Sequence, residues 1–163
     1  MARGNRIVVS PNPKGHCVEG VIAVGETPKP GTVVQIQVAT ALQGGRHTWE
    51  LYNVAADGSR PSGPIIILTE DLHQGRTMET AYAAGERAFG YIPLPGDELN
   101  LLIGATVVAG TATIAAGTVL IIDDTTGKFI PTTGSPEMEN AMTLEATTDA
   151  DADVWTWCQW TGY

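Results

Sequence analysis

The side chains that most often do chemistry in proteins are dispersed along this sequence. The three histidines, His16, His47 and His73, stand far apart, and none belongs to an H-E-x-x-H or H-x-x-E-H spacing. A histidine-based zinc site is therefore not indicated. His16 directly precedes Cys17, but neighbouring residues on a strand point to opposite faces, which would keep the imidazole away from the thiolate.

Two pairs of adjacent carboxylates stand at expected turns. Asp97 and Glu98 follow Gly96, and Asp123 and Asp124 precede a Thr-Thr-Gly sequence. Acidic residues in such places commonly accept hydrogen bonds from the N–H groups of the turn. Catalysis by paired carboxylates needs two acids flanking one reacting bond, and no spacing here indicates a partner acid. We therefore interpret both pairs as structural.

The alternating residues Asp149, Asp151 and Asp153 have the spacing with which a calcium loop begins. An EF-hand loop needs a central glycine and a glutamate at its twelfth position, where this sequence has Trp160. A solvated loop is the better interpretation. Because the sequence also has no G-x-S-x-G elbow and no phosphate-binding loop, it predicts no enzyme, no metal and no cofactor. A binding or structural protein is favoured.

The net charge of −9 and the pI of about 4.6 argue against a nucleic-acid partner. The charge is unevenly distributed, because Arg3, Arg6 and Lys14 make the N-terminus basic whereas the C-terminal part is acidic. A basic arm of this kind either docks on an acidic surface of its own or a neighbouring copy, or forms a solvated tail.

Cys17 and Cys158 stand near opposite ends of the chain and form no C-x-x-C motif. We expect free thiols, with a bridge between the termini as the alternative. No apolar run is long enough for a membrane helix, and the N-terminus lacks the apolar core of a signal peptide. The sequence therefore predicts a protein that is made and folded in a cytoplasm and has no membrane partner.

The elements that must position these side chains are short. The 19 glycines and 10 prolines of this 163-residue chain separate runs of β-branched residues, which favours strands over long helices. One helical turn is predicted at residues 69–75, with Thr69 as N-cap and Gly75 as its stop. The pattern predicts an all-β fold of about ten short strands, a compact β-barrel or β-roll of tulip or clip type with little helix. We expect an extended N-terminal arm over residues 1–13 and a single β-rich domain over residues 14–163.

Two stretches of the sequence echo each other. GETPKPGTVVQI (25–36) and GTATIAAGTVLII (110–122) each carry a glycine that is followed by Gly-Thr-Val at the start of a β-prone run. We expect the second glycine of each to open a strand as part of a tight hairpin. Shared turn chemistry alone would also explain two such copies.

The C-terminal sequence VWTWCQWTGY predicts a last strand with bulky aromatic residues on both faces. Because such a strand needs cover on both sides, Trp155, Trp157 and Trp160 are predicted to lie at a subunit interface. The alternative is a central strand that the same chain covers on both faces.

The segment ERAFGYIPLPGDELNLLI joins two β-prone runs through a proline-rich corner. Pro93 and Pro95 cannot donate hydrogen bonds, and Gly96 permits an unusual backbone angle. Asp97 is placed to cap the turn. We interpret these four residues as a rigid structural corner that stops one strand and aims the next.

The same segment, continued by VVAGTATIAAGTVLIIDDTTGKF and a late Leu-Glu-Ala at 144–146, resembles the head decoration, or capsid cement, proteins of tailed bacteriophages. Such proteins carry a y-x-P-x-P-G-D-E segment before a strand, then an I-A-A-G-T-x-L hairpin and a D-x-x-G-K turn. The resemblance covers residues 82–147 well, the N-terminal part loosely and residues 41–80 not at all.

This resemblance implies a small β-rich protein without enzymatic activity that binds the outer surface of a phage head after shell expansion, often as a trimer. Its partners would be the major capsid protein and copies of itself, and its location would be the virion. Its N-terminal arm would add a strand to the capsid or to a neighbouring subunit, so that deleting the arm would leave a folded protein. The binding residues of this arm are expected to be Arg3, Arg6, Ile7, Val8 and Val9.

Two other functions are compatible with the sequence. Trp49, Tyr52 and either Trp155 or Trp157 would supply stacking platforms for a carbohydrate- or receptor-binding β-module of a virion fibre. A small β-clip enzyme domain or a pilus-assembly module is suggested only by the Gly-Thr-Val hairpins.

Overall fold

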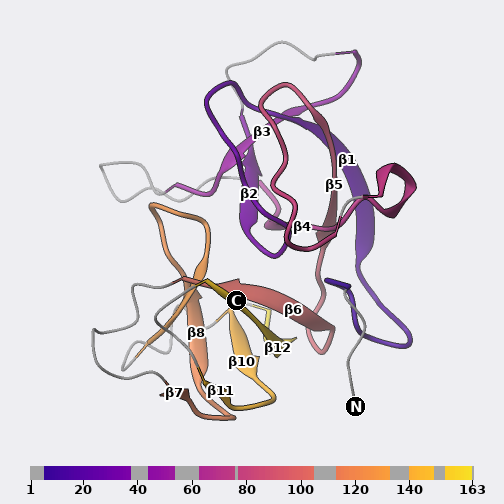
Figure 1. The fold of residues 1–163 in the computed structure, drawn as a ribbon. Helices are drawn as coiled ribbons and strands as arrows, with labels where there is room; N and C mark the ends of the chain where they lie inside the picture. The colour runs from indigo at the N-terminus through magenta and orange to yellow at the C-terminus, as the bar shows by residue number, and fades with distance from the viewer. Residues whose placement is uncertain are drawn as a thin grey trace.

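A computed structural model of the chain shows two small β-barrels that pack against each other (Figure 1). The first barrel is drawn in indigo to magenta and the second in salmon to yellow, so the two follow one another along the chain. The structure describes residues 6–37, 44–53, 63–75, 77–104, 113–132, 140–148 and 153–162.

The first half of the chain forms a closed five-stranded barrel with the strand order β1-β3-β2-β4-β5. Its strands are β1 (His16–Ile22), β2 (Val33–Ile36), β3 (Thr48–Leu51), β4 (Ile66–Leu68) and β5 (Arg87–Ile92). Neighbouring strands pair antiparallel except β1 and β3, which run parallel. Closing the sheet on itself pairs strand edges that an open sheet would expose.

The second half forms another closed five-stranded barrel with the order β10-β12-β6-β9-β8. Its strands are β6 (Glu98–Ile103), β8 (Val119–Ile122), β9 (Phe129–Pro131), β10 (Ala141–Thr143) and β12 (Val154–Trp160). Here β6 and β9 are the parallel pair. A separate two-stranded sheet joins β7 (Thr113–Ile114) to β11 (Thr147–Thr148).

The two barrels have the same topology. When β1 to β5 are matched in order to β6, β8, β9, β10 and β12, every neighbour and every strand direction agrees. The registers agree as well, because Ile22 lies opposite Trp49 in the first barrel and Ile103 lies opposite Phe129 in the second. The chain therefore contains an internal structural repeat, in which one barrel topology occurs twice.

One turn recurs at the entries to the strands of both barrels. In each copy the N–H of the fourth residue donates a hydrogen bond to the carbonyl of the first, and the third residue is a glycine with φ between 75° and 90°. These features define a type II turn, whose third position needs positive φ and therefore favours glycine. The turns occupy residues 29–32, 83–86, 94–97 and 115–118. The two echoing stretches of the sequence supply the first and last of them, at matching positions before β2 and β8.

The interiors of the barrels are apolar, and one cluster of buried residues spans both. Val33, Ile67 and Tyr91 of the first barrel belong to the same cluster as Leu99 and Leu101 of the second. A further cluster fills the first barrel around Trp49, which is 1% exposed. A Cβ at Gly20 would collide with the ring of Trp49, and a Cβ at Gly90 would collide with Ile66 and lie tightly against the same ring. These two glycines therefore make room for the largest core side chain.

The all-β prediction is confirmed, although the chain closes two barrels where the sequence suggested one. The predicted helical turn is present as a 3₁₀ turn over Leu72–Gln74, and Gly75 follows it with φ of 71°. Its cap is Asp71 rather than Thr69, because Asp71 Oδ1 accepts a hydrogen bond from the N–H of Gln74 at 3.3 Å. No helix in the described ranges is both long and apolar enough to cross a membrane.

Candidate binding surfaces

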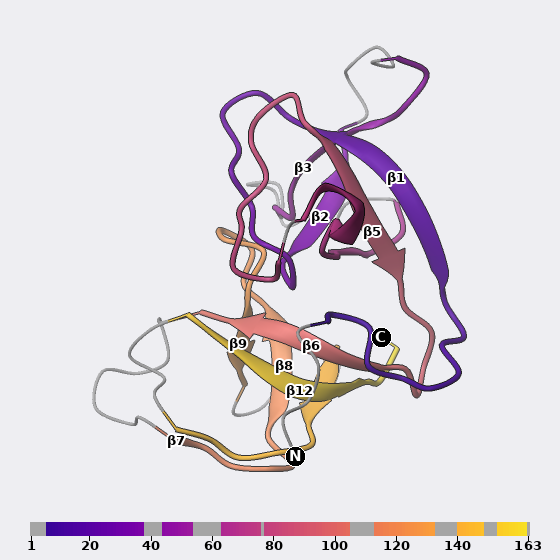
Figure 2. The same cartoon turned by 45° about the vertical axis from the view of Figure 1, so that its right-hand side comes forward.

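The described part of the N-terminal segment lies along β6 of its own chain (Figure 2). Val8 forms an antiparallel bridge with Leu99. The N–H of Val9 donates to the carbonyl of Glu98 at 3.0 Å, and the N–H of Asn100 donates to the carbonyl of Ile7 at 2.7 Å. These bonds use the part of the β6 edge that β9 leaves open, since β9 pairs with β6 only at Ile103.

This placement revises one part of the arm hypothesis. The side chain of Ile7 is fully buried in the core cluster that spans the two barrels, and its N–H donates to Glu70 Oε2 at 3.0 Å. Ile7 is therefore ordered by its own chain and is not available to a partner. Arg6 is exposed, while Val8 and Val9 are half-buried, so a contact of these residues with a partner stays a prediction. Arg3 lies outside the described residues.

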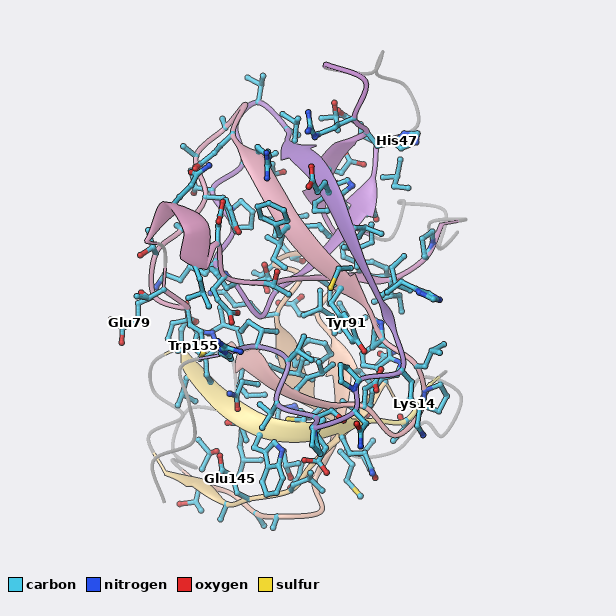
Figure 3. All side chains as sticks on the ribbon, turned by 90° about the vertical axis from the view of Figure 1, so that its right-hand side faces the viewer. Lys14, His47, Glu79, Tyr91, Glu145 and Trp155 are labelled. Carbon is cyan, nitrogen blue, oxygen red and sulfur yellow. The ribbon has the colours of Figure 1, made fainter. Side chains whose placement is uncertain are left out.

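A buried carboxylate joins the N-terminal segment to the corner between the barrels. Asp97 is fully buried and accepts hydrogen bonds from the Tyr91 hydroxyl at 2.8 Å and from the N–H of Leu94 at 2.9 Å. It also accepts from the N–H groups of Lys14 at 2.8 Å and Gly15 at 3.1 Å. Figure 3 shows Lys14 and Tyr91 at this junction. Three donors bond to Oδ2 and one to Oδ1, and the side chain is fully buried, so Asp97 organises structure and is not accessible to a substrate.

The ionisation of this pair follows from its surroundings. Burial acts to raise the pKa of Asp97, but the donors from Leu94, Lys14, Tyr91 and Gly15 outweigh it and lower the pKa below its ordinary value of 3.8. Burial, together with the hydrogen bond to Asp97, raises the pKa of Tyr91 to about 12. The neutral hydroxyl and the charged carboxylate are therefore the stable forms over the whole range near neutral pH.

The predicted corner has the geometry of a type II turn. Gly96 has φ of 90°, and its N–H donates to the carbonyl of Trp160 at 2.9 Å. The N–H of Asp97 donates to the carbonyl of Leu94 at 3.0 Å, which closes the turn. Pro93 and Pro95 flank Leu94, so neither removes a donor that these bonds use. The corner thus stops β5, starts β6 and connects to the end of β12.

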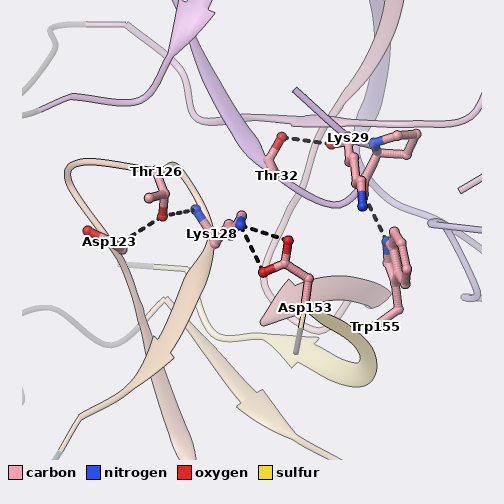
Figure 4. A network of polar contacts seen from close by, with 8 residues as sticks. Lys29, Thr32, Asp123, Thr126, Lys128, Asp153 and Trp155 are labelled. Atoms are coloured by element: carbon pink, nitrogen blue, oxygen red, sulfur yellow. Dashed lines mark hydrogen bonds and ion pairs between the residues drawn. The ribbon is translucent and has the colours of Figure 1, made fainter. Parts of the chain in front are cut away.

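A polar seam connects the two barrels on another side (Figure 4). The indole Nε1–H of Trp155 donates to the carbonyl of Pro30 at 2.9 Å, and Lys29 Nζ lies 5.8 Å from the centre of the Trp155 ring. Beside these contacts, within the second barrel, Lys128 Nζ contacts both carboxylate oxygens of Asp153, at 2.7 and 2.8 Å. No sequence pattern indicates these contacts, because each joins residues far apart in the chain.

The seam borders a cleft of about 270 Å³. The residues that line it are Pro28, Lys29, Thr32, Leu51, Leu102, Thr125, Thr126, Lys128 and Asp153. Asp123, at the foot of the hairpin, accepts from the Thr125 N–H at 3.0 Å and from the Thr126 hydroxyl at 2.6 Å. Asp123 therefore stabilises its own turn. The charged groups that line the cleft already make contacts within the chain, Lys128 with Asp153 and Lys29 with Trp155.

The three tryptophans of β12 have different surroundings. Trp160 is 4% exposed and makes an edge-to-face contact with Phe129 at 6.4 Å, so it is a core residue of the second barrel and not an interface residue. Trp155 is partly covered by Lys29 and Pro30 of the first barrel. Trp157 is half-buried, and its backbone N–H donates to Glu145 at 3.2 Å. Only Trp155 and Trp157 keep partly exposed side chains, so an interface role stays a prediction for them.

Reactive groups are few in the described ranges. Both cysteines are free thiols, with Cys17 exposed and Cys158 buried. Burial, and secondarily the charge of Glu145, raises the pKa of the Cys158 thiol far above its ordinary range, so this thiol stays protonated. No group of three or more histidine, cysteine or carboxylate side chains that could hold a metal ion occurs among the described residues. Asp149 and Asp151 lie outside them, and so does the side chain of His73.

The chain matches no protein-family model, and it matches no curated protein. The resemblance noted above therefore rests on the sequence motifs, whose residues lie in β5, β6 and β8 and in the turns that precede β6 and β8.

Proposed function

We propose that this protein decorates the outer surface of a bacteriophage head and stabilises the shell by bridging capsid subunits. The observation that carries the proposal is the structural role of the resembling motif. In the P-L-P-G-D-E segment, the glycine and Asp97 build the corner that joins the two barrels to the N-terminal segment and to β12. A motif that makes the junction of the two barrels rigid suits a protein that holds other subunits in place.

The surface offers places where a shell could be contacted. Arg6 and Lys14 are exposed, and Lys14 Nζ donates to the carbonyl of Pro95 at 3.4 Å, beside the 41% exposed Leu94. Val24 is 87% exposed at the tip of a turn in the first barrel. Exposed aliphatic residues on rigid turns bind with little loss of conformational freedom. Basic groups near the N-terminus also complement an acidic partner surface.

Small contacts are enough for this function. A protein that binds only the assembled shell stabilises it by mass action. If copies act as a trimer, as the resemblance implies, three modest contacts reinforce one another through their high effective concentration. Contacts between copies would use the partly exposed Trp155 and Trp157. In this proposal the protein is made in the host cytoplasm and ends on the outer face of the virion.

The carbohydrate-binding alternative loses two of its stacking platforms. Trp49 is 1% exposed inside the first barrel, and Tyr52 is 8% exposed. The Trp155 ring is already covered on one side by Lys29. Stacking on sugars needs an open ring face, so the structure does not favour this function over shell binding.

Co-sedimentation tests the proposal. The purified protein is mixed with expanded heads of the phage that encodes the chain, and compact proheads of the same phage are the matched control. We expect saturable binding to expanded heads and little binding to proheads. If the protein stays in the supernatant with both kinds of particle at micromolar concentrations, the proposal is wrong.

A further inference from the structure

The internal repeat identifies a strand edge that is filled in the second barrel and open in the first. The parallel strand pairs of the two barrels have the same residue register. In the first barrel the Ala23 N–H donates to the Trp49 carbonyl, and in the second barrel the Gly104 N–H donates to the Phe129 carbonyl. This match places Val18 of β1 at the position that Leu99 occupies in β6. It also matches Glu19 to Asn100, and Cys17 to Glu98.

In the second barrel the edge at Leu99 is occupied by the N-terminal segment. Asn100 donates its N–H to the carbonyl of Ile7, and the carbonyl of Glu98 accepts from Val9. With this segment in place, Leu99 is fully buried. The occupant is a short extended run of aliphatic residues that pairs antiparallel with the barrel strand.

In the first barrel the matching edge has no strand among the described residues. The Ile22 N–H donates to the Glu86 carbonyl on the β5 side of β1, so alternation turns the backbone groups of Cys17 and Glu19 to the opposite side. On that side β3 pairs with β1 only at Val21 and Ile22. Within the described ranges, neither the Glu19 N–H nor the Cys17 carbonyl has a hydrogen-bond partner. Figure 2 shows this end of β1 beside β5 and extending beyond β3.

The side chains around this edge indicate the chemistry of an occupant. Val18 is only half-buried, although it packs on the core cluster of the first barrel with Ile36 and Ile92. Glu19 contacts Arg46 at 3.0 Å beside this edge, and it contacts Arg87 of β5, on the other side of β1, at 3.7 Å. Arg46, which precedes β3, supplies a cation on the open side of β1.

We propose that the edge of β1 at residues 17–19 binds an extended segment of the capsid protein by strand addition. The segment pairs antiparallel with β1 and places an aliphatic residue opposite Val18, as Val8 lies opposite Leu99. An acidic residue at its flank meets Arg46. Main-chain hydrogen bonds supply the affinity and the aliphatic and acidic positions supply the specificity. This inference rests on the proposed function.

The test compares two substitutions at Glu19. Glu19→Pro removes the outward N–H that the added strand needs, and proline is tolerated where an edge N–H makes no ladder bond. Glu19→Ala is the matched control, because it removes the same carboxylate and keeps the N–H. Binding to expanded heads is measured by co-sedimentation at several protein concentrations. We expect Glu19→Pro to weaken binding at least about tenfold relative to Glu19→Ala.

Hydrogen exchange of the unmodified protein gives a second readout that does not depend on folding of the proline variant. The amide of Glu19 is expected to exchange about tenfold or more slowly when the protein is bound to heads than when it is free. If the protein binds heads but the Glu19 amide is not protected, or if both variants bind equally, strand addition at β1 is wrong and the proposed function stands. If the unmodified protein does not bind heads, the proposed function fails and this inference fails with it.

Discussion

The hydroxyl of Tyr91 donates a 2.8 Å hydrogen bond to Asp97, and this contact ties the end of the first barrel to the start of the second. Both side chains are almost completely buried, at 1% and 0% exposure. The same carboxylate accepts the N–H groups of Lys14 and Gly15, which lead into β1. One acidic side chain therefore fixes three segments of the chain at the junction.

Replacing Asp97 tests the importance of this junction. In Asp97→Asn, the amide NH₂ replaces an oxygen that accepts from at least one backbone N–H, so at least one buried donor loses its acceptor. We expect a loss of about 2–4 kcal/mol in the free energy of unfolding, measured by urea denaturation. Glu98→Gln is the control at the neighbouring, less buried position and should change stability by less than about 0.5 kcal/mol. Equal stabilities of the two variants would show that the carboxylate is not structural.

The pH dependence of stability follows from the same pair. The pKa of Asp97 is lowered in the folded protein, so the carboxylate stabilises the fold above its ordinary value of 3.8, and this stabilisation is lost as pH falls through the lowered pKa. The pKa of Tyr91 is raised from 10.0 to about 12, so its contribution is present below pH 10 and is lost as pH rises towards 12.

The variant Tyr91→Phe isolates the loss of stability at alkaline pH. Two pKa units correspond to about 2–3 kcal/mol, so the unmodified protein should lose roughly this much more stability than Tyr91→Phe between pH 10 and 12. Thermal unfolding followed by circular dichroism across this range measures the difference. Parallel curves for the two proteins would contradict the assigned shift.

The N-terminal segment should contribute to the stability of the isolated protein. Ile7 is fully buried between the barrels, so Ile7→Ala removes core contacts and leaves a cavity. We expect a loss of about 2–4 kcal/mol in chemical denaturation. The exposed neighbour provides the control, since Arg6→Ala should change stability by less than about 0.5 kcal/mol. A fold as stable without the Ile7 side chain would restore the idea of an independent arm, whose deletion the sequence predicts to leave a folded protein with weaker capsid binding.

The corner glycine has a backbone conformation that other residues adopt at a cost. Gly96 has φ of 90°, and a Cβ there would approach Lys14 Nζ to 3.2 Å. We expect Gly96→Val to destabilise the fold by about 1–3 kcal/mol in thermal denaturation. Gly63→Ala is the control, because no atom lies near a Cβ at that position and its φ is not positive. A change of similar size in both variants would mean that the positive φ of Gly96 does not make the corner more sensitive to substitution than another loop glycine.

The sequence predicted the class of fold because strands and turns are local features. The run from Val33 to Ile36 predicts a strand, and the structure has β2 there. Gly96 and Gly117 predict turns, and the structure places both in type II turns. The repeat of a whole barrel was visible only as the short Gly-Thr-Val echo, since the two barrels share pairing geometry more than residue identity.

The candidate sites depended on contacts that local patterns do not encode. The partners of Asp97 at Lys14 and Gly15, and the Lys128–Asp153 pair, join distant parts of the chain. The sequence predicts interface roles for Trp160 and Ile7, because aromatic and aliphatic residues near chain ends need cover. The cover comes from the same chain, which a residue pattern alone does not distinguish from cover by a neighbour.

Cryo-electron microscopy of expanded heads, reconstructed with and without the protein, tests the central claim most directly. Shell decoration predicts extra density on the outer surface into which the two barrels fit, repeated at equivalent positions of the lattice and bridging capsid subunits. Two identical reconstructions, obtained with the protein in molar excess over capsid subunits, would contradict the account.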